Sequence, residues 1–67
     1  MYINFVTNTH NAMLNLETGR IIATDKHPRM TARQDYDFNI NDELSNPSVE
    51  QETILNAAKK EMAAKRL

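Results

Sequence analysis

Gly19 is the only glycine in this 67-residue chain, and a short run rich in apolar residues lies on each side of it. Glycine adopts positive φ angles at little cost, so a chain with one glycine has few places for a tight turn. The pattern predicts a β-hairpin with strands over about 12–16 and 21–25. Because β-branched Thr18 resists a positive φ angle, we expect a four-residue loop over 17–20 rather than a two-residue turn.

This loop would pair Leu16 with Ile21 and Leu14 with Ala23, which makes one face of the hairpin apolar. The other face would carry Met13, Asn15, Ile22 and Thr24. A single helix covers one face of a small sheet, and the sequence leaves open which face that is. Either way, one partly apolar face needs cover, so we expect a homodimer or a tight complex with a partner.

Two further segments have the alternation of β-strands. Residues 2–7 alternate loosely between two faces, and residues 35–41 alternate strictly between polar and apolar side chains. Between the hairpin and 35–41, the basic stretch 26–34 shows neither strand nor helix periodicity and is interrupted by Pro28, which indicates a connecting loop.

A C-terminal helix is predicted over about 47–66. It would begin either at Asn46 followed by Pro47, or at Ser48 with Gln51 three residues later as a capping box. Its apolar side chains recur at helical spacing on one stripe, namely Ile54, Leu55, Ala58 and Met62. Strands followed by one helix predict an α+β fold, an antiparallel sheet of three to four strands in a single domain over 1–67.

Composition restricts the environment and the stability of such a domain. The chain has no cysteine, which excludes disulfides and thiolate metal sites and favours a reducing, cytoplasmic location. No apolar run approaches the roughly 18 residues that a membrane span needs, so no membrane association is expected. A lone core of this size supplies no more than about 3–5 kcal/mol, so partner binding would also add stability.

The charged residues are sorted along the chain although the net charge is only −1. Six carboxylates and no lysine or arginine lie between Asp35 and Glu52, and a basic stretch lies on each side. Such zones steer charged partners more strongly than the total charge suggests.

The residue types argue against an enzyme. His10 and His27 are the only histidines; His10 is expected at the surface of a polar loop over 7–11, and no known catalytic motif accompanies either. The oxygen-rich segment 35–43 has the wrong residues for a calcium loop, and a single glycine cannot build a phosphate-binding loop. We therefore expect no catalytic residues, no metal and no cofactor.

Two binding hypotheses remain. In the first, the chain is a small non-enzymatic regulator or inhibitor that binds another protein, for instance a nucleic-acid-handling one, through an apolar sheet face and the acidic segment 35–52. Its binding residues would be Met13, Ile22, Asp35, Asp37, Asp42 and Glu43. The alternative is a nucleic-acid-binding regulator that uses the basic residues of 20–33, which are Arg20, Lys26, Arg29 and Arg33.

Overall fold

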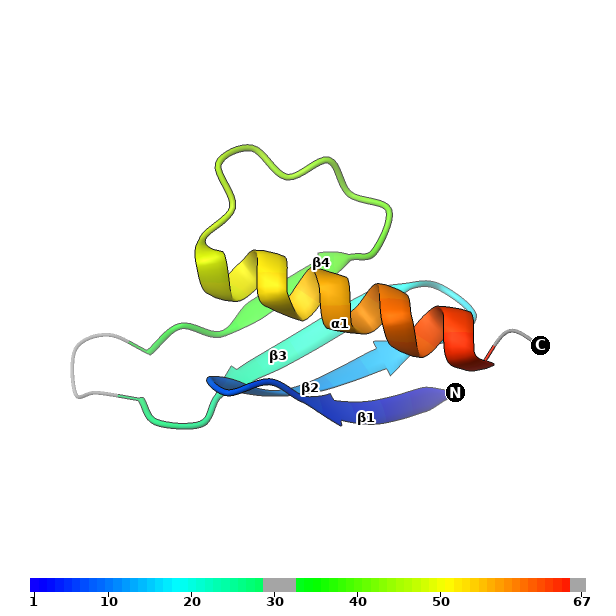
Figure 1. Ribbon diagram of the computed structural model, residues 1–67, viewed down its shortest axis with the longest axis horizontal. Helices are drawn as coiled ribbons and strands as arrows, with labels where there is room; N and C mark the ends of the chain where they lie inside the picture. The colour runs from blue at the N-terminus through cyan, green and yellow to red at the C-terminus, as the bar shows by residue number, and fades with distance from the viewer. Residues whose placement is uncertain (29–32, 66–67) are drawn as a thin grey trace.

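The computed structural model describes residues 1–28 and 33–65, which form an antiparallel sheet with one helix across a face (Figure 1). The strands follow one another in the sheet in chain order, so each pairs with the next. The α+β prediction is therefore confirmed, with four strands and a C-terminal helix. The elements are β1 (Tyr2–Val6), β2 (His10–Asn15), β3 (Arg20–Asp25), β4 (Tyr36–Asn39) and α1 (Val49–Lys65).

The hairpin forms around Gly19, but the predicted register is wrong. Leu14, and not Leu16, pairs with Ile21, so the loop covers 16–19 instead of 17–20. Asn15 ends β2 because its side-chain Oδ1 accepts hydrogen bonds from the turn amides of Glu17 and Thr18, at 2.9 and 3.1 Å. Gly19 closes the loop at φ 80° and donates its N–H to the Asn15 carbonyl at 2.8 Å.

The difference in register does not change which side chains share a face of the hairpin. Ile21 pairs with Leu14 instead of Leu16, which is a shift of two residues along β2. Because side chains alternate between the faces with a period of two, each side chain stays on its predicted face. The buried hairpin face contains Leu14 and Ile21, and the other face contains Met13 and Ile22, which are cross-strand partners.

The remaining strand boundaries differ from the sequence predictions at their ends. β2 begins two residues early, at His10, because Thr7 turns the chain sharply: its N–H donates to the His10 carbonyl at 2.9 Å, and its Oγ1 accepts from the His10 amide. β4 ends at Asn39 instead of residue 41, because Asp42 turns back onto Asn39.

The prediction of an exposed His10 is wrong, because this side chain is 1% exposed. Its Nδ1 lies 2.7 Å from the Thr9 hydroxyl, and its Nε2 lies 2.6 Å from the Gln34 carbonyl. The ring also packs at 5.3 Å, centroid to centroid, against Tyr36 of β4. Both ring nitrogens are therefore satisfied inside the fold, and His10 joins β2 to the segment before β4.

The helix begins with the second of the two predicted capping signals, Ser48 with Gln51. Ser48 is the N-cap, since its Oγ accepts the amide of Gln51 at 3.1 Å, while Asn46 precedes it with φ 50°. The same Ser48 hydroxyl lies 2.8 Å from the Tyr36 hydroxyl, which fixes the start of α1 to β4. Val49, next to the cap, is 76% exposed.

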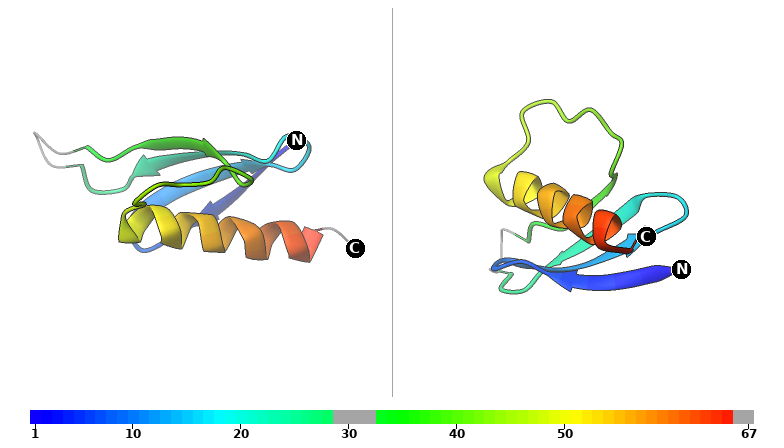
Figure 2. Two further views of the ribbon diagram at one scale, coloured as in Figure 1. Left: turned by 90° about the horizontal axis from the view of Figure 1, so that it is seen from above. Right: turned by 45° about the vertical axis from the view of Figure 1, so that its right-hand side comes forward.

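The core lies between the sheet and α1, which form two layers in the left view of Figure 2. The sheet contributes the larger share of the buried side chains, and the helix contributes Ile54 and Ala58. Leu55 and Met62 are partly buried at the border of the same cluster. Its members from the strands are Phe5, Ala12, Leu14, Ile21, Ala23 and Phe38.

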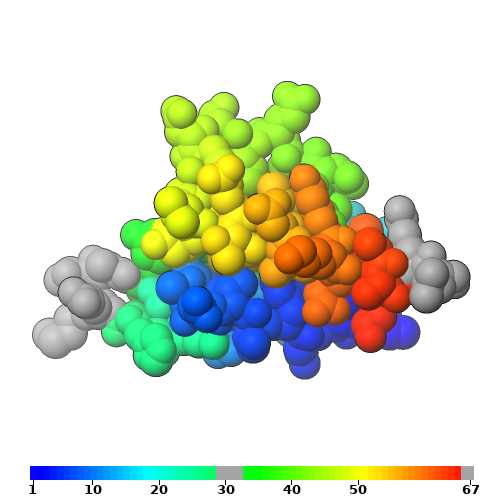
Figure 3. Space-filling model, viewed as in Figure 1, coloured from blue at the N-terminus to red at the C-terminus, as the bar shows by residue number. Residues whose placement is uncertain are grey.

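Figure 3 shows the molecule from the side on which α1 covers the strands. The chain packs this one face of the sheet with its own helix and leaves the opposite face without a layer over it (Figure 2). Among the residues described, no helix combines the length and apolarity needed to cross a bilayer.

Candidate protein-binding surface

The sheet surface opposite α1 carries an apolar patch. We call this surface the open face. Four of its side chains are large and apolar, and they come from β1, β2 and β3: Tyr2, Val6, Met13 and Ile22. Tyr2 is 43% exposed, Val6 65% and Met13 38%, while Ile22 is half-buried. These values leave a substantial apolar area in contact with solvent.

The strand pairing explains why these residues meet. Met13 lies in β2 between its partners Asn4 of β1 and Ile22 of β3, so Met13 and Ile22 form the centre of the open face. Tyr2 and Val6 stand two residues to either side of Asn4 and therefore point to the same face. Because β1 pairs with β2, the first strand adds Tyr2 and Val6 to the face that carries Met13 and Ile22.

Uncharged polar side chains surround the patch. Asn4, Asn11, Asn15 and Thr24 occupy the neighbouring positions of the open face; Asn15 and Thr24 were expected on this face of the hairpin, whereas Asn4 and Asn11 were not singled out from the sequence. A shallow depression of about 400 Å³ lies among Asn4, Val6, Asn11, Met13 and Thr24. An apolar centre with a polar border is the usual arrangement of a protein–protein interface.

Arg20 and Asp37 form an ion pair at the border of the open face. The Arg20 guanidinium donates to both carboxylate oxygens of Asp37, Nε at 3.0 Å and Nη2 at 2.6 Å. These hydrogen bonds lower the pKa of Asp37 and raise that of Arg20. Asp37 is also the cross-strand partner of Ile22, so a neutralised pair stands beside the apolar centre.

A second carboxylate, Asp35, is bound within the chain. Its Oδ1 accepts the backbone amide of Asp25 at 2.9 Å, and its Oδ2 accepts Nε of Arg33 at 2.7 Å. The backbone hydrogen bond and then the arginine lower the pKa of Asp35. Asp25 in turn accepts the amides of His27 and Gln34, so these carboxylates join the end of β3 to the segment before β4.

The six carboxylates of the acidic segment do not form one row. Asp37 lies on the open face, whereas Glu50 and Glu52 lie in the first turn of α1 on the other side of the sheet. Asp42 and Glu43 lie in the loop after β4, where the Asp42 carboxylate accepts the Asn39 amide at 3.0 Å. Of the predicted protein-binding residues, the structure brings together Met13, Ile22 and Asp37.

The basic residues of the alternative hypothesis are divided in the same way. Arg20 and Arg33 are bound to Asp37 and Asp35, so two of the four cations are neutralised by members of the acidic set. Lys26 follows the end of β3, and Arg29 lies outside the described residues. The charge zones seen along the sequence are therefore interleaved in the folded chain.

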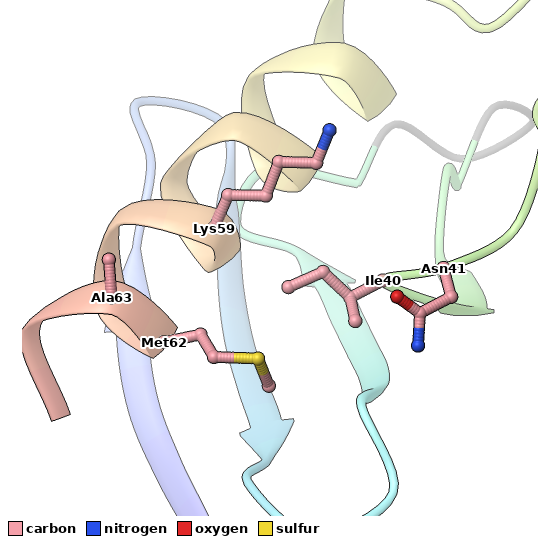
Figure 4. A pocket seen from close by; sticks show the side chains of 5 residues that line it. All are labelled: Ile40, Asn41, Lys59, Met62 and Ala63. Carbon is pink, nitrogen blue, oxygen red and sulfur yellow. The ribbon is translucent and has the colours of Figure 1, made fainter. Parts of the chain in front are cut away.

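A second concave region lies on the helix side. Ile40 and Asn41, after β4, face Lys59, Met62 and Ala63 of α1 across a cavity of about 280 Å³ (Figure 4). Ile40 and Met62, which line it, are partly buried against the core, and a second, smaller cavity between them and the hairpin loop is lined by Glu17 to Gly19. Within 1–28 and 33–65, no three histidine, aspartate or glutamate side chains converge to hold a metal ion.

In comparisons with known proteins, no protein-family model, curated protein or solved structure matches the chain.

Proposed function

We propose that this protein acts as a small regulator or inhibitor that binds another protein through the open face of its sheet. The observation that supports the proposal is the gathering of Tyr2, Val6, Met13 and Ile22 on a sheet face that no helix of the described chain covers. Exposed apolar side chains that are contiguous and bordered by polar ones typically mark a surface for a macromolecular partner.

The charges of the open face favour a protein over a nucleic acid as that partner. Two charged side chains at its border, Arg20 and Asp37, pair with each other. Binding to nucleic acid depends on cations that replace counterions along the phosphates, which a neutral face does not supply. A protein partner with an apolar, uncharged counter-surface instead gains from burial of the central side chains.

Met13 and Ile22 are expected to dominate the binding energy. Side chains at the centre of an interface lose all contact with water, whereas those at its border stay solvated and contribute little. Asp37 is the acidic residue that would take part, as one half of the Arg20–Asp37 ion pair at the border.

A charge at the centre of the open face tests the proposal. Ile22→Lys places an ammonium group between Met13 and Asp37, where the neighbouring carboxylate helps the fold to tolerate it. The matched control is Asn56→Lys, which adds the same charge to an exposed position of α1. Circular dichroism of both variants checks that they keep the wild-type fold.

Wild-type and variant chains are then compared as baits in native lysate, and the captured protein is purified for titration. A specific partner should bind wild type and Asn56→Lys equally and bind Ile22→Lys at least about tenfold more weakly, since a charge buried in an apolar interface is poorly solvated. Equal affinity for all three baits would contradict binding through the open face. Loss of affinity with Asn56→Lys alone would place the interface on α1.

A further inference from the structure

We propose that two copies of this chain associate through the outer edge of β1, which pairs antiparallel with itself and joins the two sheets into one. The proposal concerns the edge of the sheet and not its open face, so it stands or falls independently of the proposed function. The strand that pairs with this edge is β1 of a second copy of the chain.

The hydrogen bonds of the β1–β2 ladder show which backbone groups of β1 are unused. At its two ends, Leu16 donates to the Met1 carbonyl at 3.0 Å and Thr7 donates to the His10 carbonyl at 2.9 Å. Antiparallel ladders use alternate residues, so Ile3 and Phe5 also direct their backbone groups toward β2. The N–H and C=O groups of Tyr2, Asn4 and Val6 therefore point outward, and no described segment lies beside them (Figures 1 and 2).

β1 also lacks the features that usually protect an edge strand. Its sequence, Tyr-Ile-Asn-Phe-Val, contains no charge and no proline, and four of its five residues favour β-structure. An edge of this kind is a template for another strand. Because it carries no charge, two copies meet without electrostatic repulsion.

The opposite edge of the sheet, β4, is partly occupied and carries a charge, which makes β1 the less protected edge. In β4 the outward backbone groups of Asn39 are both occupied by Asp42, whose amide donates to the Asn39 carbonyl and whose carboxylate accepts the Asn39 N–H. Asp37 occupies the other outward position of β4 and presents a carboxylate. A charged side chain on an edge strand discourages pairing with another strand, and β1 lacks such protection.

The sequence of β1 is complementary to itself about Asn4. In the register that places Asn4 opposite its own copy, Tyr2 lies opposite Val6 and Ile3 lies opposite Phe5. This register brings the outward groups of Tyr2, Asn4 and Val6 into hydrogen-bonding positions with the same residues of the second copy. Each cross-strand pair is either aromatic with β-branched or amide with amide, and such pairs stabilise antiparallel sheets.

Pairing through β1 also extends the apolar patch. Tyr2 and Val6 lie on the open face, so across the two-fold axis the Tyr2 side chain of one copy contacts the Val6 side chain of the other. The helices of both copies stay on the opposite face, because a two-fold axis perpendicular to the sheet preserves its sides. Burial of exposed Tyr2 and Val6 adds to the backbone hydrogen bonds in stabilising the dimer.

Asn4→Pro tests the edge with little disturbance of the β1–β2 ladder. The N–H that proline removes points outward, and edge strands tolerate proline at such positions. The matched control is Asn4→Ala, which changes the side chain and keeps the N–H. Sedimentation over a range of concentrations should show wild type and Asn4→Ala in equilibrium between one and two chains, with the dissociation constant of Asn4→Pro raised by about tenfold or more.

Amide hydrogen exchange of the wild-type chain provides a second test that needs no variant. The amides of Asn4 and Val6 should exchange quickly in dilute solution and slowly at high concentration, while the Phe5 amide, which faces β2, is protected at both. Concentration-dependent protection at Asn4 supports edge pairing. A chain that stays monomeric at all concentrations, a dimer in which the Asn4 amide exchanges quickly, or equal association of Asn4→Pro and Asn4→Ala would overturn the proposal.

Discussion

Ile54→Ala is the substitution that most directly probes how α1 is held on the sheet. Ile54 is 0% exposed and, with Ala58, forms the fully buried part of the helix. The neighbours of Ile54 in the core come from paired strands, which cannot move inward to fill the space that the substitution leaves.

The size of the effect follows from this packing. Ile→Ala in a core costs about 2–5 kcal/mol through lost burial and the cavity left behind. A rigid site belongs in the middle of that range, so we expect a loss of about 3 kcal/mol in the free energy of unfolding. A 67-residue chain has a total stability of about 3–10 kcal/mol at 0.05–0.15 kcal/mol per residue, so the substitution removes a large fraction of it.

Urea unfolding followed by far-UV circular dichroism measures the change, with two comparison variants. Ile54→Val should cost about 1 kcal/mol, because it removes one methyl group from the same site. Val49→Ala, at a position that is 76% exposed in the first turn of α1, should change the stability by less than about 0.5 kcal/mol. An Ile54→Ala cost no larger than that of Val49→Ala would refute the packing of α1 on its own sheet.

Three further predictions concern single polar groups and the loop glycine. Arg20 lowers the pKa of Asp37, so the stability that Asp37 contributes should be present above the unfolded-state pKa of about 4 and lost as the pH falls through the lower folded-state pKa. The difference in free energy of unfolding between wild type and Asp37→Asn, measured in urea, should therefore shrink over this pH range. A difference independent of pH would contradict the ion pair. Gly19→Ala should lower the melting temperature, because φ at this position is 80° and the added Cβ would lie 2.8 Å from Cγ2 of Ile40. An unchanged melting temperature would argue against this loop geometry. Ser48→Ala should cost about 0.5–2 kcal/mol through loss of the helix cap, whereas Ser45→Ala, at an exposed loop position, should be nearly neutral; equal costs would place the cap elsewhere.

Local periodicity was sufficient to predict the elements of this fold. Strict alternation located β4, Gly19 located the hairpin, and the start of α1 follows one of the two capping signals that the sequence offered, the one at Ser48. The face assignment of Met13 and Ile22 was also predictable, because strand periodicity fixes sides even when the register is shifted.

Hydrogen bonds between side chains and backbone were not predictable from periodicity. The Asn15 side chain ended β2 one residue early, and the Thr7 hydroxyl started the same strand at His10. His10 was expected at the surface because its neighbours are polar, but its ring bonds to the Gln34 carbonyl, 24 residues away in the sequence. Contacts over such sequence distances leave no local pattern.

The candidate site was predicted in its apolar part and not in its charged part. Met13 and Ile22 could be found because a hairpin must place them together. The acidic and basic segments looked like separate zones, yet Arg20 reaches Asp37 across the β3–β4 pair, and Arg33 bonds Asp35 two residues on. Pairing across strands depends on the register, which a one-dimensional charge pattern does not contain.

Oxidative footprinting of the complex with the captured partner tests the central claim that the open face is the binding surface. Met13 on the open face and Met62 of α1 carry the same oxidisable group on opposite sides of the sheet, so each serves as the control for the other. Binding through the open face predicts that Met13 oxidises several-fold more slowly in the complex than in the free chain, while Met62 keeps its rate. A Met13 rate unchanged by the partner would contradict the proposal, and protection of Met62 alone would move the interface to the helix side.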